Sequence, residues 1–336
     1  MLTVRSFRNN DPPRLLELWQ KSQSRPHDAA PLISLSLNQL QSQVLGLPMQ
    51  DHQSIMLAFD EKRPVGYVHT AFVPTQDGYS FDPAIGQICF LCVDPDYFDV
   101  AGAAAVLLRA GEEYLIAKGA QKIFGGSPSP SAPFYTGFYS GGEAVGILHA
   151  DKTMIDAFQG AHYCVHQKTS WFYFDLRNYS SSITAEVAGY YDELQVEIYE
   201  VPAAKTWWEG CSLAHGIWFD ATASLIQTHR PVARLRTRIT YPDTGSILAM
   251  YGRTWHASLM ELRVHPDFTD EGIKRYLLSE LVHYLALQNQ IVQIEAHVSE
   301  DSPLFSLLHK QGWQVRGTGS VFVKNVDQPP HDSGVP

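Results

Sequence analysis

The chain contains the same sequence pattern twice, and this internal repeat constrains the fold more than any other feature. The first copy reads ICFLCVDPDYFDVAGAAAVLL and the second reads LMELRVHPDFTDEGIKRYLL. Each copy consists of an apolar strand, a Val-x-Pro-Asp-aromatic segment, an acidic loop, a glycine and a leucine-bearing helix. Pro95 and Pro266 are 171 residues apart, and Gly102 and Gly272 are 170 apart. A repeat at this spacing predicts two copies of one domain.

Both copies have the elements of an anion-binding cradle. Backbone N–H groups at a helix N-terminus have no partner within the helix, and the helix dipole adds partial positive charge there. A phosphate can therefore bind without any cationic side chain. Gly102 and Ala104 permit close approach to the backbone, because larger side chains would block it. A single glycine- and alanine-rich helix start is more often a packing feature, but its repetition favours the cradle.

These residues resemble motif A of the GNAT (N-acetyltransferase) superfamily. That motif has the pattern Arg/Gln-x-x-Gly-x-Gly/Ala, and its loop amides hold the pyrophosphate of acetyl-coenzyme A (acetyl-CoA). The three marked positions are occupied in the first copy by Asp99, Gly102 and Ala104, and in the second by Thr269, Gly272 and Lys274. Both copies therefore lack the usual Arg or Gln, and Lys274 places a long side chain where the family has a small residue. The resemblance covers nearly the whole chain.

The resemblance implies an α/β (α+β) fold of two tandem GNAT-like domains, each a mixed, mostly antiparallel sheet flanked by helices. We expect the first domain at 1–177, with its cradle at 91–104, and the second at 184–325, with its cradle at 262–274. The polar segment RNYSSSI separates them. The tail at 326–336 is rich in Pro, Asp, Ser and Gly, and we expect it to be disordered.

Local patterns predict the same order of elements in the first half, independently of the motif. Alternation, caps and turn signals predict a strand at 2–7, helices at 11–19 and 37–47, and a hairpin at 54–73. They then predict the cradle strand and helix at 88–118, a short strand at 122–124, a helix at 152–161 and a closing strand at 165–176. In the second half, Asp220 is expected to cap a helix that ends near Thr228. Residues 232–241 alternate as a strand with three arginines on one face, and these either meet phosphates or form a solvated face.

Composition excludes several classes of function. A length of 336 residues fits two domains, and the net charge of −10 argues against general binding to nucleic acid or anionic membranes. No apolar leader or span is present, so a cytoplasmic protein without membrane partners is expected. Four cysteines are too few for a disulfide scaffold. Cys89 and Cys92 lie on a predicted strand and face opposite sides, which favours core cysteines over a metal or redox pair.

The resemblance implies acetyl-CoA as cosubstrate and no metal. The expected cofactor-binding residues are Leu91, Cys92, Val93, Asp99, Val100, Ala101, Gly102, Ala103 and Ala104 in the first copy, and Leu262, Val264, Gly272, Ile273 and Lys274 in the second. A strand amide near 91–93 or 262–264 would stabilise the oxyanion. We expect the first copy to hold the donor, because Lys274, Asp270 and Glu271 crowd and charge the second loop.

Candidate proton-transfer groups come from outside the family pattern. In the family a Tyr on the last helix protonates the leaving thiolate, but Phe158 and Leu308 stand at that position here. Tyr135 and Tyr139 are the nearest candidate acids in the first copy, in a segment that either lines the pocket or fills the core of its own domain. In the second copy, candidate bases on the cradle strand are Glu261 and His256, although Glu261 could equally form a solvated pair with Arg263.

These observations predict an acyl-CoA-dependent N-acyltransferase that transfers acetyl to a primary amine of a small molecule or peptide, by direct attack on the thioester. Two alternatives remain open. A catalytically silent acyl-CoA-binding sensor or scaffold is favoured by the missing Tyr in both copies. An aminoacyl or peptidyl transferase of the tandem-GNAT kind that does not use CoA is favoured by both degenerate loops. The acceptor, the acyl group and the oligomeric state are left open.

Overall fold

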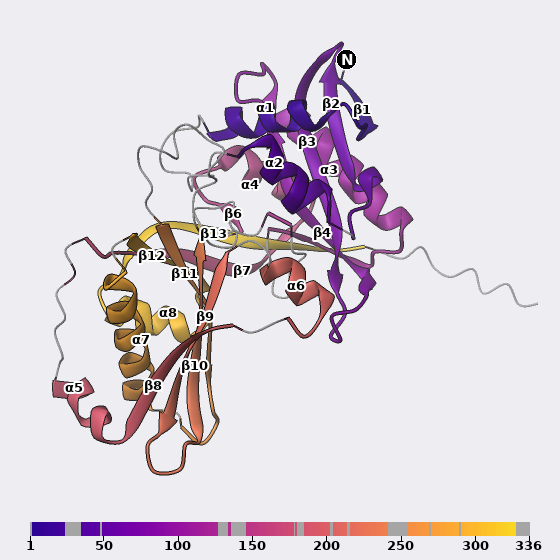
Figure 1. The fold of residues 1–336 in the computed structure, drawn as a ribbon. Coiled ribbons are helices and arrows are strands. Elements are labelled where there is room, and N and C mark those ends of the chain that lie inside the picture. Colours follow the sequence, from indigo (N-terminus) through magenta and orange to yellow (C-terminus); the bar gives the residue numbers. More distant parts are fainter. Residues whose placement is uncertain are drawn as a thin grey trace, which may run out of the picture.

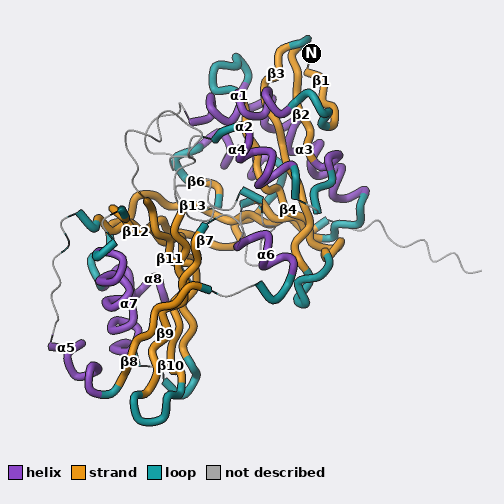
Figure 2. The backbone as a smooth tube through the Cα atoms, in the orientation of Figure 1, coloured by secondary structure: helices purple, strands orange, loops and turns teal. Residues whose placement is uncertain are grey.

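The computed structural model describes residues 2–23, 35–47, 49–126, 134–135, 146–177, 179, 185–201, 204–213, 216–240, 255–268, 270–288 and 290–326. These residues form a mixed α/β fold in which helices cover the faces of a long twisted sheet (Figure 1). Figure 2 shows the same arrangement coloured by secondary structure, with the strands of both halves forming one continuous sheet.

The first half follows the predicted element order. Its helices and strands are β1 (Leu2–Ser6), α1 (Pro12–Gln23), α2 (Leu37–Leu40), the π-helical turn η1 (Gln41–Leu45), the 3-10 turn η2 (His52–Ser54), β2 (Ile55–Asp60), β3 (Arg63–Pro74), β4 (Phe81–Val93), α3 (Val100–Ala117), β5 (Lys122–Gly125), β6 (Ile147–Leu148), α4 (Lys152–Gly160) and β7 (Cys164–Asp175).

The second half repeats this order. After the short turns α5 (Ala185–Ala188) and η3 (Gly189–Asp192), its elements are β8 (Leu194–Glu200), α6 (Trp207–Leu213), β9 (Ile217–Leu225), β10 (Pro231–Thr240), β11 (Trp255–Val264), α7 (Glu271–Ala286), β12 (Ile291–Ser299), α8 (Pro303–Lys310) and β13 (Gln314–Asn325). The predicted fold class is confirmed. The helix expected between Asp220 and Thr228 is wrong, because these residues lie largely in β9, where Asp220 pairs with Arg236 of the neighbouring strand.

The two halves share one sheet because their last strands are exchanged. The strand order is β1-β2-β3-β4-β5-β13-β7-β12-β11-β10-β9-β8, with β6 beside β13. β13 from the second half lies between β5 and β7, and β7 from the first half lies between β13 and β12. Figure 1 shows β13, in yellow, extending from the second half into the first. The closing strand predicted at 165–176 therefore pairs on both sides with strands of the second half.

The exchange reaches the cores of both halves. Phe172 on β7 is fully buried in the core of the second half, with Leu277 and Leu281 of α7. Phe322 on β13 is buried in the core of the first half, where it stacks on Phe158 of α4 at 5.5 Å between ring centroids. Each half therefore completes its core with an aromatic ring from the other, and apolar burial couples the two halves.

The sheet of the first half is covered on both faces, and this arrangement positions the candidate site. α3 covers one face through Leu107, Leu108 and Leu115. α1 packs against the opposite face, where Leu15 and Trp19 are buried. β4, the strand that leads into the first cradle, therefore faces α3 on one side and α1 on the other. We call the α1 side the aromatic face, because Trp19 lies there.

Candidate active site

The loop after β4 is fixed by a buried carboxylate. Asp94 is fully buried and forms ion pairs with Arg63 at 2.7 Å and Lys21 at 3.0 Å. Its second oxygen accepts the backbone N–H of Asp96 at 3.0 Å. Burial alone would raise the pKa of Asp94, but the hydrogen bonds from Arg63 and Lys21 outweigh it and lower the pKa. The loop that leads to the first cradle is thus held in place at its first residue.

The first cradle is capped by its own side chain. Asp99 is the N-cap of α3, and its carboxylate accepts the N–H of Gly102 at 2.9 Å. A Cβ on Gly102 would meet the Asp99 carboxylate, so a larger residue there requires Asp99 to move. Asp99 is exposed, so its side chain is free to rotate into solvent. Ala103 and Ala104 are buried in the core beneath the cradle, whereas Ala101 is exposed.

The strand before the first cradle extends past the end of its parallel neighbour. β4 pairs with β5 in parallel only from Ile85 to Ile88, opposite 122–125. At Gly125 β5 ends, so 89–93 parts from it, and Cys92 and Val93 are buried while Leu91 is partly buried. Cys89 is buried as well, and burial raises the pKa of its thiol. This agrees with the prediction of core cysteines.

Phe158 is a core residue at this parting point. Its ring is fully buried, and a Cβ on Gly125 at the end of β5 would lie 2.2 Å from it. Leu308, the corresponding residue of α8, is also fully buried. Both side chains fill the space under the sheet and offer no proton.

Tyr135 lies on the aromatic face of β4. Its hydroxyl is 3.0 Å from Nδ1 of His69, and its ring stacks on Phe90 at 4.9 Å and on Trp19 at 5.9 Å. Burial lowers the pKa of His69 to about 3, so its imidazole is neutral at physiological pH and can accept a hydrogen bond from the phenol. Tyr135 has a positive φ of 61°, which is uncommon for a bulky residue. Tyr139 lies outside the described residues.

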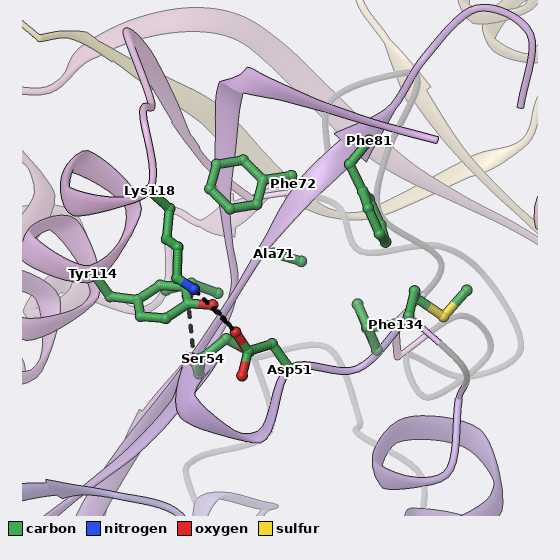
Figure 3. Close-up of a pocket in the computed structure, with 10 residues that line it drawn as sticks. Asp51, Ser54, Ala71, Phe72, Phe81, Tyr114, Lys118 and Phe134 are labelled. Carbon is green, nitrogen blue, oxygen red and sulfur yellow. Dashed lines mark hydrogen bonds and ion pairs between the residues drawn. The ribbon is translucent and has the colours of Figure 1, made fainter. Parts of the chain in front are cut away.

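A pocket of about 240 Å³ opens beside β3 (Figure 3). Phe72, Phe81 and Phe134 line its apolar part. At its polar side Asp51 accepts a hydrogen bond of 2.6 Å from Tyr114, with the Lys118 ammonium 3.7 Å away. Its further lining residues are Met49, Ser54, Thr70 and Ala71.

This pocket lies close to the parting point of β4 and β5. Thr70 and Ala71 on its wall pair with Ile88 and Gln87 of β4, and Ile88 is the last β4 residue that pairs with β5. Neighbouring strands are about 4.8 Å apart. The pocket is therefore within about two strand spacings of the place where the sheet opens.

The second cradle is covered. Asp270 caps α7 by accepting the Gly272 N–H at 2.9 Å, and the Tyr190 hydroxyl donates to the other oxygen of Asp270. A Cβ on Gly272 would lie 2.1 Å from the Tyr190 hydroxyl, so Tyr190 occupies the space over the helix start. Glu271 accepts two bonds of 2.8 Å from Lys310. Of the other cofactor candidates in this copy, Ile273 is buried, Leu262, Val264 and Lys274 are partly buried, and Thr269 lies outside the described residues.

Glu261 belongs to a surface ion-pair network. It accepts bonds of 3.2 Å from Arg234 and 2.6 Å from Arg263, and its side chain is 37% exposed. The three arginines of β10 do not form the solvated face that was one of the two expectations for them. Arg236 binds both oxygens of Asp220, at 2.8 and 2.9 Å, and Arg238 is fully buried.

His256 starts a chain of hydrogen bonds that ends at a buried carboxyl. Gln293 donates 2.7 Å bonds both to Nδ1 of His256 and to Glu295. Glu295 is fully buried, and this burial raises its pKa to about 8 despite the nearby Arg316. Glu295 was not predicted from the sequence. The available signal was a charged residue in the middle of the apolar strand IVQIEAHV.

Among the described residues, no group of three or more His, Cys, Asp and Glu side chains could hold a metal ion. None of the helices in the described part of the chain is long and apolar enough to cross a membrane.

Comparison with known proteins agrees with this geometry. Residues 13–147 match the model of the Acetyltransferase (GNAT) family. This stretch includes the first cradle, the parting of β4 from β5 and the pocket. A search of curated proteins gave no match.

Solved structures match the whole chain. A tandem GNAT protein from the clavulanic acid biosynthesis pathway is 12% identical with a TM-score of 0.63, covering 98% of this chain and all of that one. A GCN5-related N-acetyltransferase from Sphaerobacter thermophilus is 13% identical with a TM-score of 0.62, covering 96% of this chain and 95% of that one. The glucosamine N-acetyltransferase region of a fungal multi-domain GH3 β-N-acetylglucosaminidase is 15% identical with a TM-score of 0.66. That match covers 96% of this chain, which spans 38% of the fungal one.

Residues 13–147 therefore match the GNAT acetyltransferase family, and the chain has the fold of a tandem GNAT protein. At these identities the structural likeness concerns the fold.

Proposed function

We propose that the protein is an acyl-CoA-dependent N-acyltransferase that uses its first half for catalysis and transfers acetyl to a primary amine of a small molecule or peptide. The observation that carries the proposal is the difference between the two cradles. The first is capped only by the exposed Asp99, whereas Tyr190 fills the space over the second. The family model also matches residues 13–147, which lie in the first half.

In this proposal the donor pyrophosphate displaces the Asp99 carboxylate and accepts hydrogen bonds from the backbone N–H groups at the start of α3. The pantetheine arm runs along β4 toward the point where β5 parts from it. An amide near Leu91 or Val93 stabilises the oxyanion that forms when the amine attacks the thioester carbonyl. Holding the two reactants together supplies much of the rate enhancement, without a covalent enzyme intermediate.

We infer that the acceptor enters through the pocket of Figure 3. Three phenylalanines favour an apolar body, and Asp51 offers a carboxylate to a cationic group. The Lys118 ammonium lies 3.7 Å from that carboxylate and its side chain is half exposed. A substrate ammonium can therefore displace Lys118 from Asp51. The four cysteines are free in the structure, which suits the reducing cytoplasm, where acyl-CoA is available.

Calorimetry with acetyl-CoA tests the donor assignment. Gly102→Glu should eliminate binding, because the new carboxylate fills the cradle with negative charge. Gly272→Glu is the matched control and should leave the affinity within a few-fold of the wild type. Loss of binding in Gly272→Glu alone would assign the donor to the second half. Glu261→Gln would then be the decisive variant, and abolished turnover with retained affinity would identify Glu261 as the base.

One observation favours the CoA-independent alternative. The Asp99 carboxylate accepts the Gly102 N–H at the place where a diphosphate would bind. An aminoacyl or peptidyl transferase needs no pyrophosphate site, so Asp99 would keep this position. Mass spectrometry of the purified protein incubated with acetyl-CoA and a panel of amines separates the cases. Acetylated amine supports the proposal, bound CoA without product supports the sensor, and absence of both supports the alternative.

A further inference from the structure

A histidine and two hydroxyls form a hydrogen-bonded group that the function described above does not use. The two ring nitrogens of His149 lie 2.9 Å from the Thr318 hydroxyl and 2.8 Å from the Ser320 hydroxyl. The backbone N–H of His149 also donates to the carbonyl of Thr318 at 2.9 Å. Ser320 is buried, whereas His149 is exposed. The imidazole therefore links a buried hydroxyl to solvent.

This group lies where the sheet of the first half opens. On β13, Phe322 pairs with Gly125, the last β5 residue that still faces β4. Ser320 is two residues further along and pairs with Ile147 of β6. Since side chains alternate along a strand, Ser320 points to the same face as Phe322, which packs on Phe158 of α4. His149 precedes α4, so all three side chains lie on the α4 side of the opening.

Close backbone packing fixes the group. A Cβ on Gly146, before β6, would lie 2.6 Å from the carbonyl oxygen of Ser320. A Cβ on Gly126, after β5, would lie 2.9 Å from the Cα of Gly146. The glycines let β6 take the place beside β13 that β5 leaves, and this brings His149 over the two hydroxyls.

The second half lacks the histidine at the corresponding place. There the backbone N–H of Glu300 donates to the carbonyl of Lys168, as His149 does to Thr318. The strand β7 carries Ser170 where β13 carries Ser320. The serine is thus common to both closing strands, and the imidazole that contacts it is confined to the half with the open cradle.

We propose that Ser320 and His149 form the proton-transfer pair that protonates the leaving CoA thiolate in the first half. The inference rests on the proposed function. When the amine nitrogen bonds to the carbonyl carbon, the C–S bond breaks and its electron pair stays on sulfur. The sulfur takes the Ser320 hydroxyl proton, and Ser320 takes a proton from the His149 imidazolium. The proton lost by the amine returns to His149 through solvent, so the cycle balances.

The chemistry of the partners suits this role. A hydroxyl can donate or accept, so Thr318 and Ser320 can keep their bonds to His149 in both of its protonation states. Histidine is the side chain that ordinarily changes charge between pH 5 and pH 8. Charged residues on the neighbouring elements include Asp151, which caps α4, and Lys168 of β7, which pairs with Ser320 of β13. Phe158, at the family's acid position, supplies no proton itself.

Turnover and donor affinity, measured together, test the pair with acetyl-CoA and the best amine from the panel. Ser320→Ala and His149→Gln should each lower kcat about 100-fold, and the double variant should fall no further, because the residues act as one unit. The dissociation constant of acetyl-CoA should stay within twofold. Ser170→Ala is the matched control on the other closing strand and should keep wild-type turnover.

The pH profile separates proton transfer from a merely structural role. The wild-type kcat between pH 5 and pH 9 should contain a titration that His149→Gln removes. Thr318→Val should lower kcat, and Thr318→Ser should restore it, since only the hydroxyl is needed. If the Ser320 and His149 variants melt at the wild-type temperature and keep kcat within twofold, the assignment of the proton-transfer pair is overturned and the proposed function is retained. A wild-type protein that does not bind acetyl-CoA would overturn both.

Discussion

The two halves of the molecule share one backbone plan but differ on the face of the sheet opposite α3 and α7. In the first half this face carries packed rings, with Tyr135, Phe90 and Trp19 in mutual contact and the Tyr135 hydroxyl on His69. In the second half the same face carries ion pairs, such as Arg236 with Asp220. The register makes the comparison direct, because His69 pairs with Phe90 in one half and Arg236 pairs with Glu261 in the other.

The difference shows which part of the repeat is constrained by folding. The face under α3 and α7 stays apolar in both halves, because each helix must bury its leucines there. The opposite face is free to diverge. Together with the Tyr190-covered second cradle, this divergence supports our proposal that the donor binds in the first half.

The largest expected effect concerns the exchanged strands. Phe172→Ala should destabilise the protein by about 3–5 kcal/mol, because the ring is fully buried and its removal leaves a cavity. Although Phe172 belongs to the first half, amide exchange should speed up mainly in α7 and β9 to β12. Phe322→Ala is the mirror variant and should loosen α3 and α4. Loss of protection confined to each residue's own half would contradict the coupling.

A pH-dependent loss of stability should mark the charged face of the second half. The pKa of Glu295 is raised to about 8, so the folded state keeps a proton that the unfolded state releases above its ordinary value of 4.5. Stability is therefore lost as pH rises through this window, by on the order of 1 kcal/mol per pH unit.

Denaturant titrations at pH 5, 6.5 and 8 measure this slope. Glu295→Gln keeps an oxygen for the bond from Gln293 and removes the ionisation, so its slope should be flatter by that amount. Equal slopes in the two proteins would show that Glu295 does not titrate in this window.

The cradles themselves should differ in their response to charge removal. Asp99→Asn keeps a residue able to cap α3 but removes a negative charge from the pyrophosphate site, so acetyl-CoA should bind about tenfold more tightly. Asp270→Asn should change the affinity little, since Tyr190 covers that cradle. Calorimetry on both variants provides the comparison. Tighter binding in Asp270→Asn but not in Asp99→Asn would reverse the assignment of the two halves.

The sequence predicted the elements whose signals are local. The strand, loop, glycine and helix of each copy lie within about twenty residues, so their spacing survives in both halves. The exchange of β7 and β13 was not predictable, because it depends on pairing between residues far apart in sequence, such as Val323 and Cys164, which are 159 residues apart. Asp220 was misread as a helix cap because its partner, Arg236, is on another strand. Likewise, nothing near Gly272 in sequence indicates that Tyr190 covers it.

The smallest expected effect lies at the turn that leads into each exchanged strand. α4 ends with a bond from the Tyr163 N–H to the Phe158 carbonyl, and α8 ends with the equivalent bond from Trp313 to Leu308. The residue inside this turn has a positive φ in both halves, 65° at His162 and 75° at Gly312. Such a conformation costs a residue with a Cβ more than it costs glycine.

His162→Gly should therefore raise the free energy of unfolding by about 0.5–1 kcal/mol, and Gly312→Ala should lower it by about 1 kcal/mol. A Cβ at Gly312 would meet no atom within 4 Å, so the second variant reports backbone conformation alone. Paired urea titrations measure both. If His162→Gly destabilises instead, the exposed imidazole makes a contact worth more than the strain, and the two turns differ in energy as well as in sequence. A gain in His162→Gly that matches the loss in Gly312→Ala would show that the two exchanged strands start from the same turn.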